Sequence, residues 1–234
     1  MRVGFWGVMI LFNTVEACRQ LGIRSGAIVL RNVQVAESSP QLMAEIEMAA
    51  TQVSEEFDSA AMIRSSPKVK AFRELLRTVG VNPRKYSPTV ERLLQMARKH
   101  RTLPTINNLV DAYNLVSLKS RCSLGAHDVD QVSPPIELRM LTGDESFTPL
   151  GKNSVISVSA GQFGYVDAEQ RVVCWLDLLQ ADFSKVTLHT QNVLLIIEAL
   201  DVHSTREISD AFDEARSTIH EHCGGTSEIV MLPR

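Results

Sequence analysis

A set of polar side chains interrupts the otherwise apolar segment between residues 103 and 132. Its members carry amides, a carboxylate and a hydroxyl, and they are Asn107, Asn108, Asp111, Asn114 and Ser117. Each of these groups needs a hydrogen-bond partner if it is buried. Asn114 and Ser117 are three residues apart, so they share one face of a helix. Such a set either stabilises the fold or surrounds a small pocket in which a water molecule is positioned for hydrolysis.

Basic residues are concentrated in a second segment, from Arg64 to Arg101. It holds eleven Lys or Arg residues and only two acidic ones, although the whole chain has a net charge of −3. A segment this basic can attract a polyanion such as RNA, and it can equally be the solvated face of ordinary helices. The candidate RNA-binding residues are Lys68, Lys70, Arg73, Arg77, Arg84, Lys85, Arg98 and Lys99.

The sequence has no clear motif for a metal, a cofactor or a covalent nucleophile. There is no GxSxG, no P-loop and no GxGxxG, so we expect neither a serine hydrolase nor a nucleotide cofactor. The four cysteines are widely spaced, which suits a reducing cytoplasm better than a disulfide framework. The stretch HEHC contains His220, His222 and Cys223, but histidines are also favoured at a helix C-terminus by the dipole. We therefore predict no metal site.

Apolar periodicity indicates which elements position these residues. Helices are expected over residues 40–57, 66–81, from 87 onward, from 104 onward and over 204–223. Strands are expected over residues 25–37, 134–142, 153–159, 162–168, 171–179, 193–200 and 227–233. With 234 residues and 44% hydrophobic side chains, the chain can form one large domain. The predicted fold is a single α+β domain with helices packed on a mainly antiparallel sheet.

The first 25 residues are interpreted as an N-terminal extension or an edge strand, and residues 26–234 as the domain itself. The opening run MRVGFWGVMILF is too short to span a bilayer and is a weak secretory signal. We expect a cytoplasmic protein that does not associate with membranes.

Four stretches between Gly80 and Leu150 occur in a recognisable order: GVNPRKYSPTVERLL, LPTINNLVDAYNLVSLK, LGAHDVDQV and LRMLTGDESFTPLG. They resemble the B3/B4 domain of the phenylalanyl-tRNA synthetase beta subunit, the module that carries that enzyme's editing site. The resemblance implies a B3/B4-like fold, tRNA or the acceptor end of aminoacyl-tRNA as partner, and no cofactor. It also implies a freestanding factor that hydrolyses the ester of mischarged aminoacyl-tRNA by means of water.

The resemblance also suggests site residues. Asn114 and Glu198, the latter inside the apolar run LLIIEALD, are the catalytic candidates. The substrate-binding candidates are Asn107, Asn108, Asp111, Tyr113, Ser117, Lys119, Gly125, His127 and Glu145. Tyr113 and Gly125 depart from the bacterial version of the module, which has threonine and histidine there, and His127 lies nearby. Structural roles are equally open for Asn107, Asn108 and Asp111, and Glu145 can simply satisfy backbone amides of a turn.

Two alternatives stay open at this point. The departures at Tyr113 and Gly125 suit a module that kept the fold, lost hydrolysis and binds tRNA or a free amino acid. A protein-interaction domain with no small-molecule pocket is the third possibility. The sequence does not indicate which amino acid or tRNA is involved, nor the oligomeric state.

Overall fold

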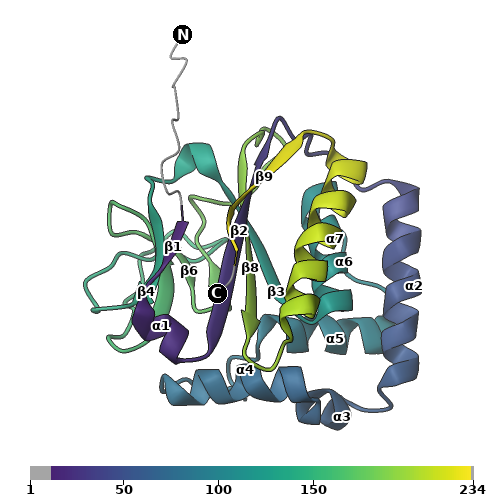
Figure 1. Cartoon of the computed structure of the whole chain (residues 1–234), viewed down its shortest axis with the longest axis horizontal. Helices are drawn as coiled ribbons and strands as arrows, with labels where there is room; N and C mark the ends of the chain where they lie inside the picture. Colours follow the sequence, from purple (N-terminus) through teal and green to yellow (C-terminus); the bar gives the residue numbers. More distant parts are fainter. Residues whose placement is uncertain (1–11, 233–234) are drawn as a thin grey trace.

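The strands form two sheets in residues 12–232, the part of the chain that the computed structural model describes (Figure 1). The four-stranded sheet is antiparallel and has the order β3 (Ser123–Asp128), β8 (Val193–Leu200), β2 (Ile23–Arg31), β9 (Thr226–Met231). The five-stranded sheet has the order β1 (Phe12–Thr14), β4 (Ile136–Met140), β5 (Phe163–Val166), β6 (Val172–Trp175), β7 (Leu179–Gln180). In this sheet only the β1–β4 pair is parallel.

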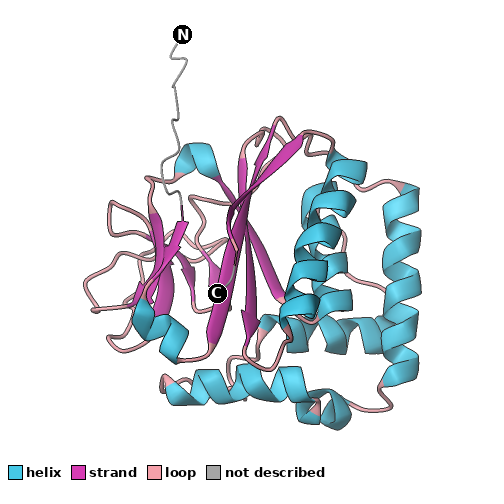
Figure 2. Cartoon of the chain, viewed as in Figure 1, coloured by secondary structure: helices cyan, strands magenta, loops and turns pink. Residues whose placement is uncertain are grey.

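Helices cover the face of the four-stranded sheet that points away from the five-stranded sheet (Figure 2). α6 (Asn108–Ser120) and α7 (Thr205–Cys223) pack on each other beside this sheet, and α2 (Pro40–Glu56) lies outside them against α5 (Thr89–His100) and α6. The short α3 (Ala60–Ser65) and α4 (Pro67–Thr78) run along the bottom of the view in Figure 1. α1 (Glu16–Gln20) links β1 to β2, and a 3₁₀ turn spans Val129–Gln131.

The layering explains why β8 is almost entirely apolar. This strand lies between β3 and β2, with helices over one face and the five-stranded sheet over the other, and all eight of its residues are buried. A strand that is buried on both faces favours a continuous apolar run rather than alternation. Glu198, near the end of that run, is therefore placed inside the molecule.

The predicted α+β class with mainly antiparallel strands is confirmed, although there are two sheets in the described residues instead of one. The strand expected over 153–159 is wrong, because this segment is exposed apart from Val158 and pairs only through one bridge, Ile156 to Phe147. The sequence missed α1, α3 and β3. Each is short, and β3 is polar and contains Gly125, so its burial comes from its pairing with β8.

Residues 12–25 contribute directly to both sheets. β1 is an edge strand paired with β4, and β2 begins at Ile23, before the expected domain start at residue 26. The run MRVGFWGVMILF lies mostly outside the described residues. Within the described part, no helix combines the length and apolar character that crossing a membrane requires.

Candidate active site

A small cavity lies between the two sheets. β3 and β8 line it from the four-stranded sheet, while β5, β6 and the turn after β6 line it from the other. Its volume is about 50 Å³, which is room for one or two water molecules. The lining side chains that carry chemistry are His127, Tyr165, Cys174, Asp177 and Glu198.

Glu198 is the most deeply buried carboxylate at this cavity. Only 2% of its surface is exposed, and the Tyr165 hydroxyl donates a hydrogen bond to its Oε2 atom. Its other oxygen, Oε1, is buried and has no hydrogen-bond partner within residues 12–232. Burial raises the pKa of Glu198, and the nearby charge of Asp177 raises it further, against the opposing hydrogen bond from Tyr165. Glu198 is therefore the carboxyl that keeps its proton more readily.

Asp177 is a second carboxylate, and it lies in the turn between β6 and β7. The preceding residue, Leu176, is fully buried with a positive φ of 55°, a left-handed conformation that is strained for leucine. Thr89 at the start of α5 donates a hydrogen bond to the Asp177 carbonyl and so fixes the turn. The Oδ2 atom of Asp177 is buried, with no hydrogen-bond partner in the part of the chain that the structure describes. Burial raises its pKa, whereas the positive charge of Arg92 and a hydrogen bond from Ser123 limit that rise.

These two carboxyls can act as a general acid and a general base. Both line one cavity, and each has one oxygen without a partner. Asp177 has a cation and hydrogen-bond donors that favour its ionised form, while Glu198 has a hydrophobic strand around it. Two carboxyls whose environments separate their pKa values are a common arrangement for general acid–base chemistry. A water molecule between them would meet a base on one side and a hydrogen-bond donor on the other.

His127 and Gly125 belong to the same cavity wall. His127 is 2% exposed, and burial lowers its pKa to about 4, so the ring is neutral at pH 7. Its Nδ1 atom lies 3.3 Å from both Ser184 Oγ and Gln180 Nε2. Gly125 is a β3 residue at which an added Cβ would meet no atom within 4 Å. The missing side chain therefore leaves space at the cavity.

The asparagine pair and Asp111 hold the beginning of α6 in place. Asn107 caps the helix by accepting a hydrogen bond from the Val110 amide. Asn108 accepts from the Ala36 amide and donates to the carbonyls of Gln34 and His222, all at 2.9 Å. Asp111 accepts from the Ser38 hydroxyl and the Ile106 amide. Their polar atoms are thus used within the fold, and none of the three lines the cavity.

The expected convergence of Asn114 and Ser117 with Glu198 is not what the structure shows. Both belong to α6, which lies on the helical side of the four-stranded sheet, whereas Glu198 bonds to Tyr165 on the opposite side (Figure 1). Ser117 is fully buried and accepts a hydrogen bond from the Leu124 amide. Tyr113, on the same helix, is buried in the hydrophobic core.

Lys119 and Glu145 also lie away from the cavity. Lys119 forms an ion pair with Glu214 of α7 at 2.9 Å. Glu145 lies in the turn after β4, where it accepts hydrogen bonds from the Thr142 and Gly143 amides and pairs with Arg139. Burial would raise the pKa of Glu145, but these bonds outweigh it and lower the pKa to about 2. The turn therefore accounts for this carboxylate without a ligand.

Part of the basic segment is engaged inside the protein. Arg73 is only 8% exposed and pairs with the buried Glu91 at 2.7 Å, so it is a core residue and not a surface contact. Lys68 pairs with Glu207, and Arg77 pairs with Glu74. Arg98 is half-buried and donates to the Asp58 carbonyl. The candidates that are exposed and form no ion pair within residues 12–232 are Lys70, Arg84, Lys85 and Lys99.

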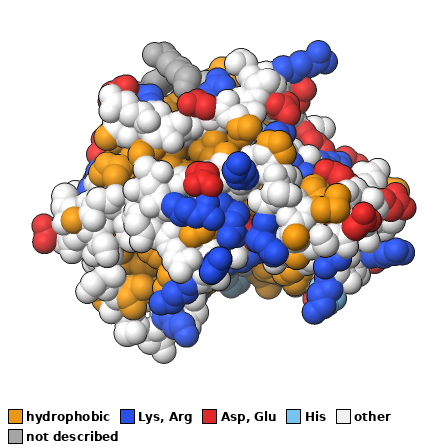
Figure 3. Space-filling view, turned by 90° about the horizontal axis from the view of Figure 1, so that it is seen from below, with side chains coloured by type: hydrophobic (Ala, Val, Ile, Leu, Met, Phe, Trp, Pro, Cys, Tyr) orange, Lys and Arg blue, Asp and Glu red, His pale blue; other side chains and the backbone are white. Residues whose placement is uncertain are grey.

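Lys and Arg side chains gather on one face of the molecule (Figure 3). Figure 3 shows Lys and Arg side chains gathered in the middle of the face seen from below, which is the side along which α4 runs in Figure 1. A groove of about 550 Å³ follows α5 and is lined by Thr89, Arg92, Met96, Lys99 and His100, among others. Arg92 also donates to the Leu178 carbonyl at 3.1 Å. The groove therefore begins beside the turn that carries Asp177.

Asp177, Tyr165 and Arg92 are among the residues of this site that escaped the sequence analysis. Asp177 lies in the run RVVCWLDLL. Aspartate is a common residue in turns between strands, so its presence there gave no functional signal. Tyr165 is one aromatic residue in a strand. Arg92 was counted in the basic segment but not singled out. Only the apolar surroundings of Glu198 gave a local signal.

Comparison with known proteins gives a matching family model and a similar solved structure. Residues 71–222 match the family model for the B3/4 domain. Among solved structures, the chain is similar to an N-terminal fragment of the phenylalanyl-tRNA synthetase beta-subunit from Pyrococcus horikoshii, with 13% sequence identity and a TM-score of 0.49. That match covers 92% of this chain and 49% of the other, so the chain spans about half the length of that fragment. No curated protein matches the chain.

Proposed function

The chain belongs to the B3/4 domain family, and on that premise we propose that it hydrolyses the ester bond of mischarged aminoacyl-tRNA in the cavity between its two sheets. Family membership supports a role connected with tRNA. The observation that carries the proposal is the pair of carboxyls, Glu198 and Asp177, which face one cavity with one unpartnered oxygen each.

The proposed reaction needs only a positioned water and a place for the developing negative charge. Asp177, kept ionised by Arg92 and Ser123, accepts a proton from the water as it attacks the ester carbonyl. Glu198, protonated because it is buried, donates a hydrogen bond to the carbonyl oxygen as that oxygen gains charge. The Tyr165 hydroxyl fixes Glu198 through Oε2 and leaves Oε1 directed to the reacting group. The ester C–O bond breaks, and the ribose oxygen leaves with the proton that Asp177 took from the water, which returns Asp177 to its ionised form.

The basic groove along α5 supplies a path for the RNA. The groove is lined by Arg92, Lys99 and His100. The first turn of α5 contacts the Asp177 turn through Thr89 and Arg92. A phosphate backbone in this groove would place the 3′ end of the RNA close to the cavity. The cavity of about 50 Å³ has to enlarge before an amino acid can enter, since ligand pockets usually measure roughly 300–1,000 Å³.

The test is the rate of ester loss from a panel of mischarged tRNAs, measured with purified protein and with buffer. We expect acceleration with at least one member of the panel. Glu198→Gln keeps a hydrogen-bond donor and should retain activity within about tenfold, whereas Glu198→Ala should lose roughly 10²–10³-fold. If no tRNA in the panel is deacylated faster than in buffer, hydrolysis is rejected.

The small cavity favours a second candidate function, binding of tRNA without turnover. In that case the groove along α5 would bind RNA and the carboxyl pair would have no chemical role. Filter binding with uncharged tRNA distinguishes the two functions. Binding that is unchanged by Glu198→Ala, together with no deacylation by the unmodified protein, would establish the non-catalytic role.

A further inference from the structure

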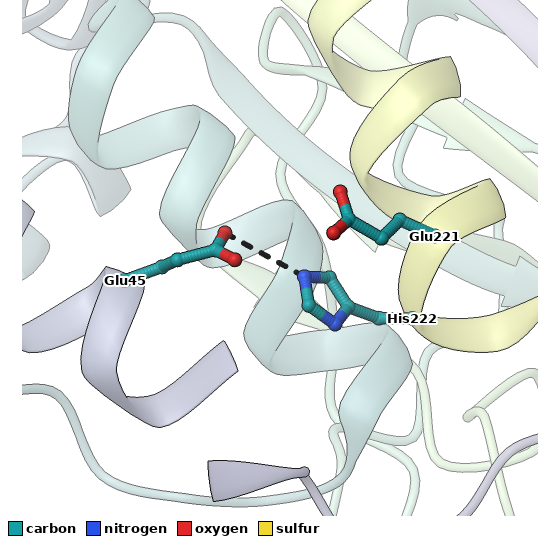
Figure 4. Close-up of side chains that lie close together, drawn as sticks. All are labelled: Glu45, Glu221 and His222. Carbon is teal, nitrogen blue, oxygen red and sulfur yellow. Dashed lines mark ion pairs between the residues drawn. The ribbon is translucent and has the colours of Figure 1, made fainter. Parts of the chain in front are cut away.

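We propose that Glu45, Glu221 and His222 form a binding site for a divalent transition-metal ion of the Zn²⁺ type, which links α2 to the end of α7. Figure 4 shows the three side chains pointing toward one another. One potential ligand atom from each lies within 4.8 Å of the others. This site lies on the helical side of the molecule and is independent of the cavity between the sheets.

His222 provides the main evidence for a ligand. Its side chain is only 4% exposed, and its Nε2 atom is buried without a hydrogen-bond partner among the described residues. That nitrogen lies 3.5 Å from the Glu45 Oε2 atom. Two ligand atoms on one tetrahedral Zn²⁺, with bonds of about 2.0–2.2 Å, are about 3.3–3.6 Å apart. Only small side-chain movements would be needed to bring all three ligand atoms to bonding distance from one ion.

The charge around the cluster favours a cation. Neither Glu45 nor Glu221 forms an ion pair with a Lys or Arg within residues 12–232. Glu221 and His222 belong to the last turn of α7, where the helix dipole places partial negative charge. Two carboxylates at a negative helix end repel each other, and a divalent ion would neutralise them.

Gln41 already holds the two carboxylates together. Its Nε2 atom donates to Glu45 Oε1 at 3.1 Å and to Glu221 Oε1 at 2.7 Å. A half turn of the amide would present its oxygen to the ion as a fourth ligand, with water as the other candidate. Asn108 fixes the backbone at His222 by donating to its carbonyl at 2.9 Å. The buried histidine is therefore held in position before any ion binds.

The donor set indicates the class of metal. One imidazole nitrogen with two carboxylates suits Zn²⁺ and its neighbours in the first transition row, whereas Mg²⁺ and Ca²⁺ prefer oxygen ligands alone. The HEHC stretch by itself does not describe this site, because His220 points elsewhere and contacts the Gly225 carbonyl. Glu45 comes from α2, which the sequence could not place beside residue 222.

The experiment is a calorimetric titration of the EDTA-treated full chain with ZnCl₂, with Co²⁺ absorption as a second readout. We expect one Zn²⁺ per chain, no competition from excess Mg²⁺, and a higher unfolding temperature with Zn²⁺. His222→Gln and Glu45→Gln should each weaken binding by more than about 100-fold, because even residues behind the ligands contribute roughly 10–100-fold.

Two matched substitutions serve as controls. His220→Gln lies on the same helix, and Glu47→Gln is an exposed carboxylate on α2; both should leave Zn²⁺ binding unchanged. Circular dichroism verifies that every variant is folded. If His222→Gln does not fold, Glu45→Gln still tests the proposal, because the Glu45 side chain is only half-buried. No binding at millimolar Zn²⁺, or binding that survives both ligand substitutions, overturns the proposal and leaves a histidine–carboxylate ion pair.

Discussion

At the scale of single residues, burial decides which carboxyl is charged. Glu198 lies in a strand whose eight residues are all buried, and its partner is a tyrosine hydroxyl. Asp177 lies in a turn that is half-buried and close to Arg92. The two side chains therefore differ in proton affinity through their surroundings and not through their chemistry. That difference assigns the base to Asp177 and the hydrogen-bond donor to Glu198.

Replacing Glu198 with Gln tests this assignment through stability. The raised pKa of Glu198 stabilises the folded protein fully below its unfolded value of about 4.5, and this contribution is lost as the pH rises through the folded value. A glutamine side chain does not ionise, so it makes no such pH-dependent contribution to stability. The stability of Glu198→Gln relative to the unmodified protein should therefore increase by roughly 1–4 kcal/mol between mildly acidic and alkaline pH. Urea unfolding across this pH range measures it.

Glu47→Gln, at an exposed position on α2, is carried through the same series as the control for a Glu-to-Gln change away from the cavity. A Glu198→Gln stability difference that does not change with pH would mean that Glu198 ionises as freely in the folded protein as in the unfolded chain. The proposed donor role would then fail.

Sequence reasoning found some site residues and missed others for identifiable reasons. Glu198 was identified because a charge inside an apolar strand is unusual, whereas Asp177 depends on the backbone of Leu176 and on contact with α5, which local sequence does not reveal. The polar set of α6 was assigned to a pocket because amides and carboxylates look alike in either role. In the structure, Asn107, Asn108 and Asp111 use their polar atoms to anchor the helix.

At the scale of elements, amphipathic periodicity located the long helices well. α2, α4, α5 and α7 carry regular apolar stripes, and α7 has a capping box formed by Ser204 and Glu207. The short elements depend on partners distant in sequence and could not be found this way. The same limit explains Arg73, which looked like part of a basic helix face but reaches Glu91 of α5 in the interior.

The Arg73–Glu91 pair joins α4 to α5 and should be sensitive to loss of one partner. Glu91 is 1% exposed, so Arg73→Met would leave a buried carboxylate uncompensated, and we expect a loss of about 3–5 kcal/mol in unfolding free energy. Arg77→Met is the matched control, because its pair with Glu74 is exposed and should contribute less than about 1 kcal/mol. Denaturant titration of both variants makes the comparison. Equal losses would contradict a buried structural role for Arg73.

At the scale of the whole molecule, the helical layer and the two sheets meet near the β6–β7 turn. α5 carries the groove on its surface, and its first turn holds the Asp177 turn against the cavity. The face that would bind RNA and the cavity that would cleave the ester are therefore adjacent. This arrangement was not accessible from sequence, because it depends on the contact between the β6–β7 turn and the first turn of α5.

Binding of tRNA should show the salt dependence of phosphate contacts. Lys70→Ala and Lys99→Ala each remove an exposed cation that forms no ion pair with another described residue, and each should reduce the slope of log K against log salt by about 0.7–0.9. Lys185→Ala, whose lysine is paired with Asp182, should leave the slope unchanged. Affinity measured at several salt concentrations provides these slopes. Equal slopes for all of these proteins would place the RNA on another face.

The most direct measurement is single-turnover deacylation of a mischarged tRNA by the unmodified protein and by Asp177→Asn. We expect the unmodified protein to accelerate ester loss over buffer and Asp177→Asn to lose about 10²–10⁴-fold of that rate, with tRNA affinity preserved. Asp210→Asn, an exposed carboxylate on α7, should behave like the unmodified protein. Undiminished deacylation by Asp177→Asn would contradict chemistry in the cavity between the sheets.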